Sequence, residues 1–224
     1  RQEHLAGEGL RLGHYLDHGH VPGAAPHPLF DPAYYAEQIG SAPPRNETLL
    51  AHYLRCGADL KPNPLFDPAY YERFGSAGEM SPLVHYARHG GASDLPPNPL
   101  FDSYWVRRQI PVSISEKITP LEHYFRVDGN LEKGPHPLFD TAWYESEYPE
   151  AEESGRDALS HFFEEGADQG FDPHPLFYSN WYRDSHADYF TAETPSIFHY
   201  IESGHAQGLA PNPLFNGSFY TGEN

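Results

Sequence analysis

The chain has 224 residues, of which 38% are apolar and 15% aromatic, and it carries a formal net charge of −18. That length favours one or two domains, and the negative charge argues against binding to nucleic acid or to an anionic membrane surface, because both favour a basic face. No apolar run approaches the roughly 18 residues of a membrane-spanning helix, and the single cysteine, Cys56, excludes an internal disulfide bond and a cysteine-based zinc site.

The first predicted element is a short helix in the segment LGHYLDHG, and its pattern returns five times. Apolar residues stand two before, one after and two after a histidine, which makes one helical stripe, and a glycine near the end is typical of a helix C-terminus. The histidine lies roughly 150° from the centre of that stripe, so it must serve a second contact. The six histidines are His14, His52, His85, His123, His161 and His199.

We predict that each of these histidines makes a structural hydrogen bond, and a carbonyl of the proline-rich segment described next is the expected partner. A role as a ligand or an acid–base group is the alternative.

A proline-rich motif of the form Pro-x-Pro-Leu-Phe separates the copies of this helix, and we call each copy a joint. The joints are Pro26–Phe30, Pro62–Phe66, Pro97–Phe101, Pro135–Phe139, Pro173–Phe177 and Pro211–Phe215. Proline fixes its own backbone and extends the residue before it, so each joint is predicted to be a stiff connector. The middle residues are His27, Asn63, Asn98, His136, His174 and Asn212. We predict that they tie the joint to a nearby carbonyl, and a ladder of ligand-contacting donors is the alternative.

Each joint is followed by another predicted helix of about eight to ten residues, which is the first helix of a repeat, while the histidine helix is the second. The predicted N-caps are Asp31, Asp67, Asp102 and Asp140, with Ser179 as the candidate cap in the fifth copy. Three residues after the cap position stands an aromatic residue: Tyr34, Tyr70, Trp105, Trp143 and Trp181. These rings are predicted to belong to the core, and stacking on a sugar ligand is the alternative.

The motif leucines at 29, 65, 100, 138, 176 and 214 give a period of 36 to 38 residues, with one interval of 35. Two helices this short cannot bury their apolar faces alone, so the units must stack. The predicted fold is an all-α solenoid of short helical hairpins with extended Pro-x-Pro connectors. It forms one repeat domain, with a half unit at 1–25, units at 26–61, 62–96, 97–134, 135–172 and 173–210, and a half unit at 211–224. The chain is expected to be a fragment of a longer one.

The pattern offers little catalytic or metal chemistry. His14 with His18, and His85 with His89, have the i, i+4 spacing of a metal pair but lack a third ligand, so no metal and no cofactor are predicted. Nine acidic residues in 145–168 stand against one base, Arg156, which is typical of a solvated acidic face. The chain has no Gly-rich phosphate loop and no GxSxG motif, and Cys56 occupies the last turn of a helix, so no enzyme is predicted.

The segments PHPLFDPAYY and LxHYLxxG resemble tandem repeats attached to bacterial glycosyltransferases and related polysaccharide-synthesis proteins. Similar units occur in some secreted, calcium-binding hemolysin-type proteins. The resemblance covers the chain from about Leu10 to Tyr220, but the NPDV segment that such repeats often carry after the first helix is replaced here by unlike loops. It implies an accessory repeat region, and the absence of nonapeptide calcium repeats leaves no ground for calcium binding.

The function predicted from these patterns is a non-catalytic interaction scaffold for a protein or polysaccharide partner, with specificity in the loops between the two helices of each repeat. The alternative is a structural surface or extracellular array whose copies associate head to tail. The resemblance favours the bacterial cytoplasm, with a secreted or cell-surface location as the alternative.

Overall fold

The structure is a computed structural model that describes residues 27–40, 47–75, 78–189 and 194–215. Across these ranges the secondary structure is helical apart from isolated bridges inside three joints. The prediction of an all-α protein is confirmed at this level. The predicted helix around His14 lies outside the described residues.

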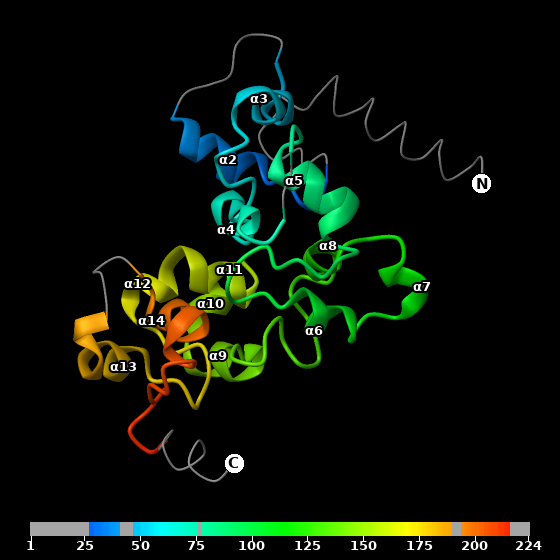
Figure 1. The fold of residues 1–224 in the computed structure, drawn as a ribbon. Coiled ribbons are helices and arrows are strands. Elements are labelled where there is room, and N and C mark those ends of the chain that lie inside the picture. Colours follow the sequence, from blue (N-terminus) through cyan, green and yellow to red (C-terminus); the bar gives the residue numbers. More distant parts are fainter. Residues whose placement is uncertain (1–26, 41–46, 76–77, 190–193, 216–224) are drawn as a thin grey trace. The chain divides into compact units, whose positions relative to one another are not determined.

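The elements are short, and irregular segments connect them (Figure 1). The first helices of the repeats are α2 (Pro32–Ile39), α4 (Pro68–Glu72), α6 (Ser103–Arg107), α9 (Thr141–Glu147) and α13 (Ser179–Ser185). The second helices are α3 (Leu49–Cys56), α5 (Pro82–His85) with η1 (Tyr86–Gly90), α8 (Pro120–Arg126), α11 (Ala158–His161) with η2 (Phe162–Gly166), and α14 (Ser196–His199) with η4 (Tyr200–Gly204). Between them lie α7 (Val112–Ser115), α10 (Pro149–Glu153), α12 (Ala167–Gln169) and η3 (Ala187–Tyr189).

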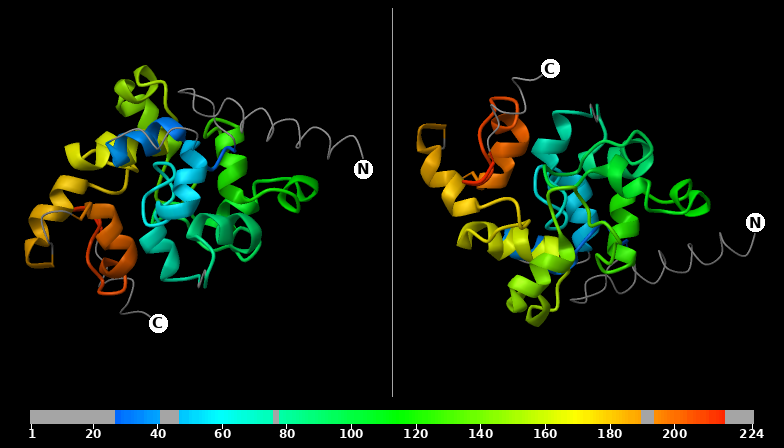
Figure 2. Two further views of the ribbon diagram at one scale, coloured as in Figure 1. Left: turned by 90° about the horizontal axis from the view of Figure 1, so that it is seen from above. Right: turned by 90° about the horizontal axis from the view of Figure 1, so that it is seen from below.

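The chain divides into two compact units, each described by itself. The first comprises residues 1–98 and 112–126, and the second comprises residues 99–111 and 127–224. Helices α2 and α3, and α4 and α5, pack against each other in the first unit, as α9 and α11, and α13 and α14, do in the second (Figures 1 and 2). The first and second helix of a repeat therefore form a hairpin in four repeats.

Aromatic side chains form most of the core. The largest fully buried side chains are Tyr35, Tyr53, Tyr71, Tyr86, Tyr124, Tyr144 and Tyr182, together with Phe30, Phe66, Phe101, Phe139 and Phe162. Each belongs to a joint, to a first helix or to the position after the repeated histidine. A tyrosine ring buries a large area on a short helix, which explains how helices of four to eight residues build a core.

The first helices begin as predicted in four repeats and differently in the fifth. The side chains of Asp31, Asp67, Asp102 and Asp140 accept hydrogen bonds from backbone N–H groups of the first turn. The prediction of Ser179 as a cap is wrong, because α13 already begins at Ser179 and the residue before it makes no capping bond. Asp172, seven residues upstream, accepts the Ser179 N–H at 2.6 Å instead.

The helices also end differently from the expectation. The first helices have five to eight residues rather than about eight to ten. Three second helices change into a π-helical turn directly after the histidine, at η1, η2 and η4, and each of these turns ends on a buried glycine. Such π-helical turns are rare and occur mostly as single turns within α-helices.

The joints share one turn and one bond to the next joint. In five of them the phenylalanine N–H donates to the carbonyl of the middle residue, which closes a turn with proline at its second position. The N–H of the residue after the phenylalanine then donates to the first proline carbonyl of the following joint. These bonds run from Asp31 to Pro62, Asp67 to Pro97, Asp102 to Pro135, Asp140 to Pro173 and Tyr178 to Pro211, at 2.8 to 3.1 Å.

The asparagines at the middle position add a second bond in the same direction. The amide groups of Asn63, Asn98 and Asn212 donate to the leucine carbonyl of the preceding joint, at 2.7 to 2.8 Å. The Asn63 Oδ1 also accepts the N–H of Leu65 at 2.9 Å. The prediction that this position donates to a nearby carbonyl agrees with the geometry at the asparagines.

We expect Asn63→Ala to destabilise the chain by about 1–3 kcal/mol, because the buried Leu29 carbonyl and Leu65 N–H lose their partner. Asn63→His should cost less, since histidine fills this position in other joints. Urea unfolding followed by circular dichroism measures both variants. Equal destabilisation by the two variants would show that the bond to the Leu65 N–H does not contribute to stability.

Candidate functional site

The repeated histidines are bonded to tyrosines of the first helix. In four repeats the Nδ1 atom of the histidine lies 2.7 to 2.9 Å from a tyrosine hydroxyl. The pairs are Tyr35–His52, Tyr71–His85, Tyr144–His161 and Tyr182–His199. The predicted second contact therefore exists, but its Nδ1 partner is a tyrosine hydroxyl rather than the joint carbonyl that we expected. His14 lies outside the described residues.

The direction of this bond is clearest in the first repeat. The Cys56 Sγ lies 3.4 Å from the His52 carbonyl oxygen, to which the thiol can donate, and 3.4 Å from the His52 Nε2. The sulfur then accepts from the Nε2–H, which leaves Nδ1 as the acceptor for the Tyr35 hydroxyl. Burial raises the pKa of Tyr35, Tyr71 and Tyr144, so these hydroxyls stay protonated near neutral pH.

A glycine closes each of these four tyrosine–histidine pairs. It stands five residues after the histidine, at Gly57, Gly90, Gly166 and Gly204. A Cβ atom added at any of them would overlap with the hydroxyl oxygen of the paired tyrosine. The glycine at the end of the second helix is thus required by the close approach of a side chain from the first helix. We call the three residues the Tyr–His–Gly cluster.

The third repeat departs from the cluster at two positions together. Val106 replaces the tyrosine and carries no hydroxyl, so His123 cannot make this bond. Asp128 stands five residues after His123, where the other repeats have glycine, and Gly129 follows one residue late. The loss of the hydroxyl and the loss of the glycine in the same repeat are the combination that the steric argument expects.

The prediction of a bond from the middle residue to a carbonyl is wrong for the Nδ1 atoms of the joint histidines, which accept a hydrogen bond instead. The Nδ1 atoms of His27, His136 and His174 accept the N–H of the leucine two residues later, at 3.0 to 3.2 Å. This is the bond that Asn63 and Asn212 make through Oδ1. Burial lowers the pKa of His136 to about 4, against a smaller opposite effect of Asp102, so His136 is neutral near pH 7.

The candidate stacking rings Tyr34, Tyr70, Trp105, Trp143 and Trp181 are half-buried. Three pack against a ring four or five residues later, as Trp143 does on Tyr148 and Trp181 on His186. The Trp105 Nε1–H donates to the Lys133 carbonyl at 3.2 Å. These rings support the helix end, and each still exposes part of its surface.

A set of bonds at the ends of the first helices was missed by the sequence reasoning. The Gln38 side chain donates to the Lys61 carbonyl and accepts the Lys61 N–H, just before the second joint. Gln109 does the same with Gly134 and Lys133, before the fourth joint. Tyr148 accepts from Asp172, and His186 lies within hydrogen-bond distance of the Ala210 carbonyl. The residue type changes between repeats, so no sequence motif reveals this contact.

The charged residues and histidine pairs that the sequence singled out form ion pairs or lie apart from one another in the described ranges. Among the nine acids of 145–168, Glu164 and Glu165 each lie 3.0 Å from the Arg156 guanidinium. The rings of His85 and His89 lie 5.4 Å apart, and His14 and His18 are outside the described residues. Within the described ranges, no three His, Cys, Asp or Glu side chains gather closely enough to hold a metal ion.

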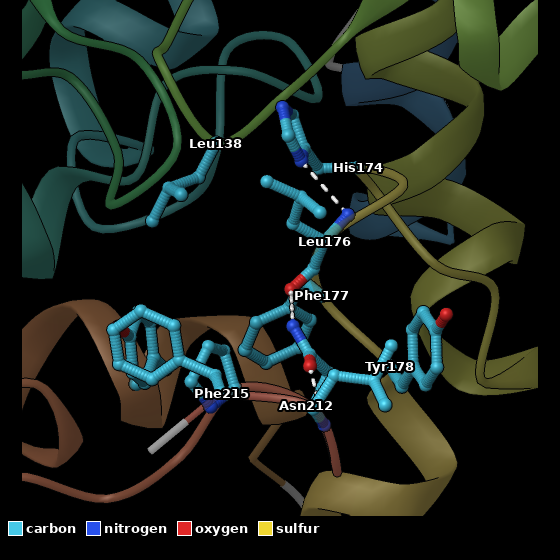
Figure 3. A pocket seen from close by; sticks show the side chains of 10 residues that line it. Leu138, His174, Leu176, Phe177, Tyr178, Asn212 and Phe215 are labelled. Atoms are coloured by element: carbon cyan, nitrogen blue, oxygen red, sulfur yellow. Dashed lines mark hydrogen bonds between the residues drawn. The ribbon is translucent and has the colours of Figure 1, made fainter. Parts of the chain in front are cut away.

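One apolar pocket of about 310 Å³ opens in the second unit (Figure 3). Leu138, Leu176 and Leu214, the leucines of three successive joints, line it. Phe177 and Tyr200 add aromatic surface, and the remaining lining is largely apolar. The pocket is suited to an apolar group rather than to a charged substrate.

No family model, curated protein or solved structure matches this chain. In the part of the chain that the structure describes, every helix is too short or too polar to cross a bilayer. Function must therefore be argued from the bonds and surfaces given above.

The Tyr–His–Gly cluster predicts a coupled pair of substitutions in the fifth repeat. Gly204→Ala should cost about 1–3 kcal/mol through overlap with the Tyr182 hydroxyl. Tyr182→Phe should cost about 1 kcal/mol through loss of the bond to His199. The double variant should lose less stability than the sum of the two single losses. The hydroxyl that clashes is then gone, and the next atom that the Cβ would meet is 3.3 Å away. Urea unfolding of the three variants measures this coupling, and strict additivity would contradict the proposed clash.

The low pKa of His136 predicts a pH-dependent stability. Between pH 6.5 and about 4 the unfolded chain binds a proton at this residue that the folded chain does not. The free energy of unfolding therefore falls as the pH falls through this window, by up to about 3 kcal/mol. His136→Asn keeps an acceptor for the Leu138 N–H and should flatten that part of the profile. Unfolding curves of both proteins across the window provide the comparison, and parallel profiles would contradict the assignment.

Proposed function

We propose that this chain is a non-catalytic repeat scaffold, built as a solenoid of short helical hairpins with a period of about 36–38 residues, that binds a protein or polysaccharide partner. The bond between successive joints carries this proposal. It recurs at all five steps with the same donor and acceptor positions, so each repeat has the same relation to the joint that follows it. Equivalent bonds at equivalent positions are what a regular array requires.

The histidines support a role other than catalysis. A general base must be within reach of a substrate proton, and its pKa must suit that task. His52, His85, His161 and His199 are instead hydrogen-bonded through Nδ1 to a tyrosine hydroxyl of their own repeat. The same bond in four repeats serves the hairpin, and one active site would need only a single copy.

A polysaccharide is the partner that we favour, on the basis of the half-exposed rings and the resemblance. Trp143 and Trp181 occupy the same place in neighbouring repeats of the second unit, each with part of its indole in solvent. Flat aromatic surfaces at repeat spacing suit the apolar faces of successive sugars. By resemblance, the scaffold would serve a bacterial glycosyltransferase as an accessory region, with the cytoplasm as the favoured location and a secreted or surface location as the alternative.

Binding of the full chain to immobilised neutral bacterial polysaccharides tests this function. Trp143→Ala and Trp181→Ala should each weaken binding about tenfold, as expected for the loss of one stacked ring. Trp→Phe at the same positions should retain most of the affinity and the fold. Val112→Ala, at a 70% exposed position on α7, is the control that should bind like the parent chain. If Trp143→Ala and Trp181→Ala both bind as tightly as the parent chain, the two rings are not part of the binding site.

A further inference from the structure

The leucines of the joints differ sharply in exposure although the motif is the same. Leu29, Leu65 and Leu100 of the first three joints are at most 1% exposed. Leu138 is half-buried, Leu176 is 65% exposed and Leu214 is 87% exposed. The last two are among the most exposed large apolar side chains of the described residues, and all three of the later leucines line the pocket in Figure 3. Exposed apolar groups that line one pocket mark an interaction surface.

The first unit shows what lies against an early joint. The His27 Nε2 of the first joint is 3.8 Å from Glu122 Oε1 on α8, the second helix of the repeat two further along. Glu122 is 7% exposed, and its neighbour Leu121 is fully buried. Helix α8 therefore lies against the joint that contains the buried Leu29. Regular stacking would require a second helix two repeats further on for every joint.

A second helix with an open apolar face exists in the first unit. On α3, Ala51 occupies the position that Glu122 has on α8, one residue before the repeated histidine, and it is exposed. Leu54, three residues after Ala51 on α3, is 49% exposed. Helix α3 thus keeps exposed Ala51 and Leu54 on the side that α8 turns to the first joint, and Arg55 beside them is ion-paired with Glu47.

We propose that the pocket formed by Leu138, Leu176 and Leu214 docks α3 of a second copy of this chain. The contact continues between molecules the packing of a second helix on a joint that the first unit contains within one molecule. The pocket and α3 are different surfaces, so the interface is heterologous and adds copies head to tail. The inference rests on the proposed repeat scaffold and names the partner that fits its open pocket.

Sedimentation velocity of the full chain from micromolar to near-millimolar concentration tests the proposal. The average mass should rise with concentration, and Leu214→Asp or Leu54→Asp should each weaken association at least about tenfold, because each places a charge in an apolar contact. Both side chains are largely exposed, so the variants should keep the circular dichroism spectrum of the parent. Val112→Asp, an equally exposed change on α7, should associate like the parent chain.

A mixture of the two variants gives the sharpest readout. Leu214→Asp retains an intact α3, and Leu54→Asp retains an intact pocket, so an equimolar mixture should form heterodimers that grow no further. The proposed docking is wrong if the parent chain stays monomeric, or if both variants associate as strongly as the parent chain. Neither result would contradict the proposed repeat scaffold. That proposal is wrong instead if Asn63→Ala and the Tyr–His–Gly variants leave the free energy of unfolding unchanged.

Discussion

The backbone bond between successive joints is the constraint on which the repeats depend. Its acceptor is a proline carbonyl, and its donor is the N–H of the residue that enters the next helix. The two prolines of a joint hold the backbone close to the bonded conformation, so little conformational entropy is lost when the bond forms. The N–H that is used lies at an N-cap residue, next to the donors that the aspartate side chain satisfies. One short motif therefore precedes a helix and is bonded to the joint that follows it.

The Tyr–His–Gly cluster links the two helices of a hairpin, as the backbone bond links successive joints. The tyrosine crosses from the first helix, its hydroxyl is hydrogen-bonded to the histidine, and the glycine leaves the space that the hydroxyl occupies. The π-helical turn falls between that histidine and that glycine in three repeats. The hydroxyl alone does not require a π-turn, because α3 reaches Gly57 without one although the Tyr35 hydroxyl approaches that glycine just as closely.

The sequence predicted the features that repeat and missed the features that depend on a partner elsewhere. Periodicity identified the two helices of each described repeat, the aspartate caps and the off-stripe position of the histidines, because each is a local pattern. The partner of His85 could not be found in that way, since Tyr71 lies on another helix and is itself on an apolar face. Asp172 as a substitute for the missing cap of α13 shows the same difficulty, because its position before the joint matches no capping motif. The exposure of Leu214 was equally hidden, because residue identity does not tell whether another helix covers a site.

Charge limits how such a scaffold can meet its partners. With a net charge of −18, two copies repel each other at long range, and only contacts that are apolar and close can overcome this repulsion. The pocket of Leu138, Leu176 and Leu214 satisfies that condition, and so do the exposed side chains of Ala51 and Leu54, beside which Arg55 is ion-paired with Glu47. A neutral polysaccharide avoids the repulsion altogether, because stacking on an indole ring involves no net charge. The negative charge thus opposes self-association through the rest of the surface, and both proposed contacts are of a kind that this repulsion does not prevent.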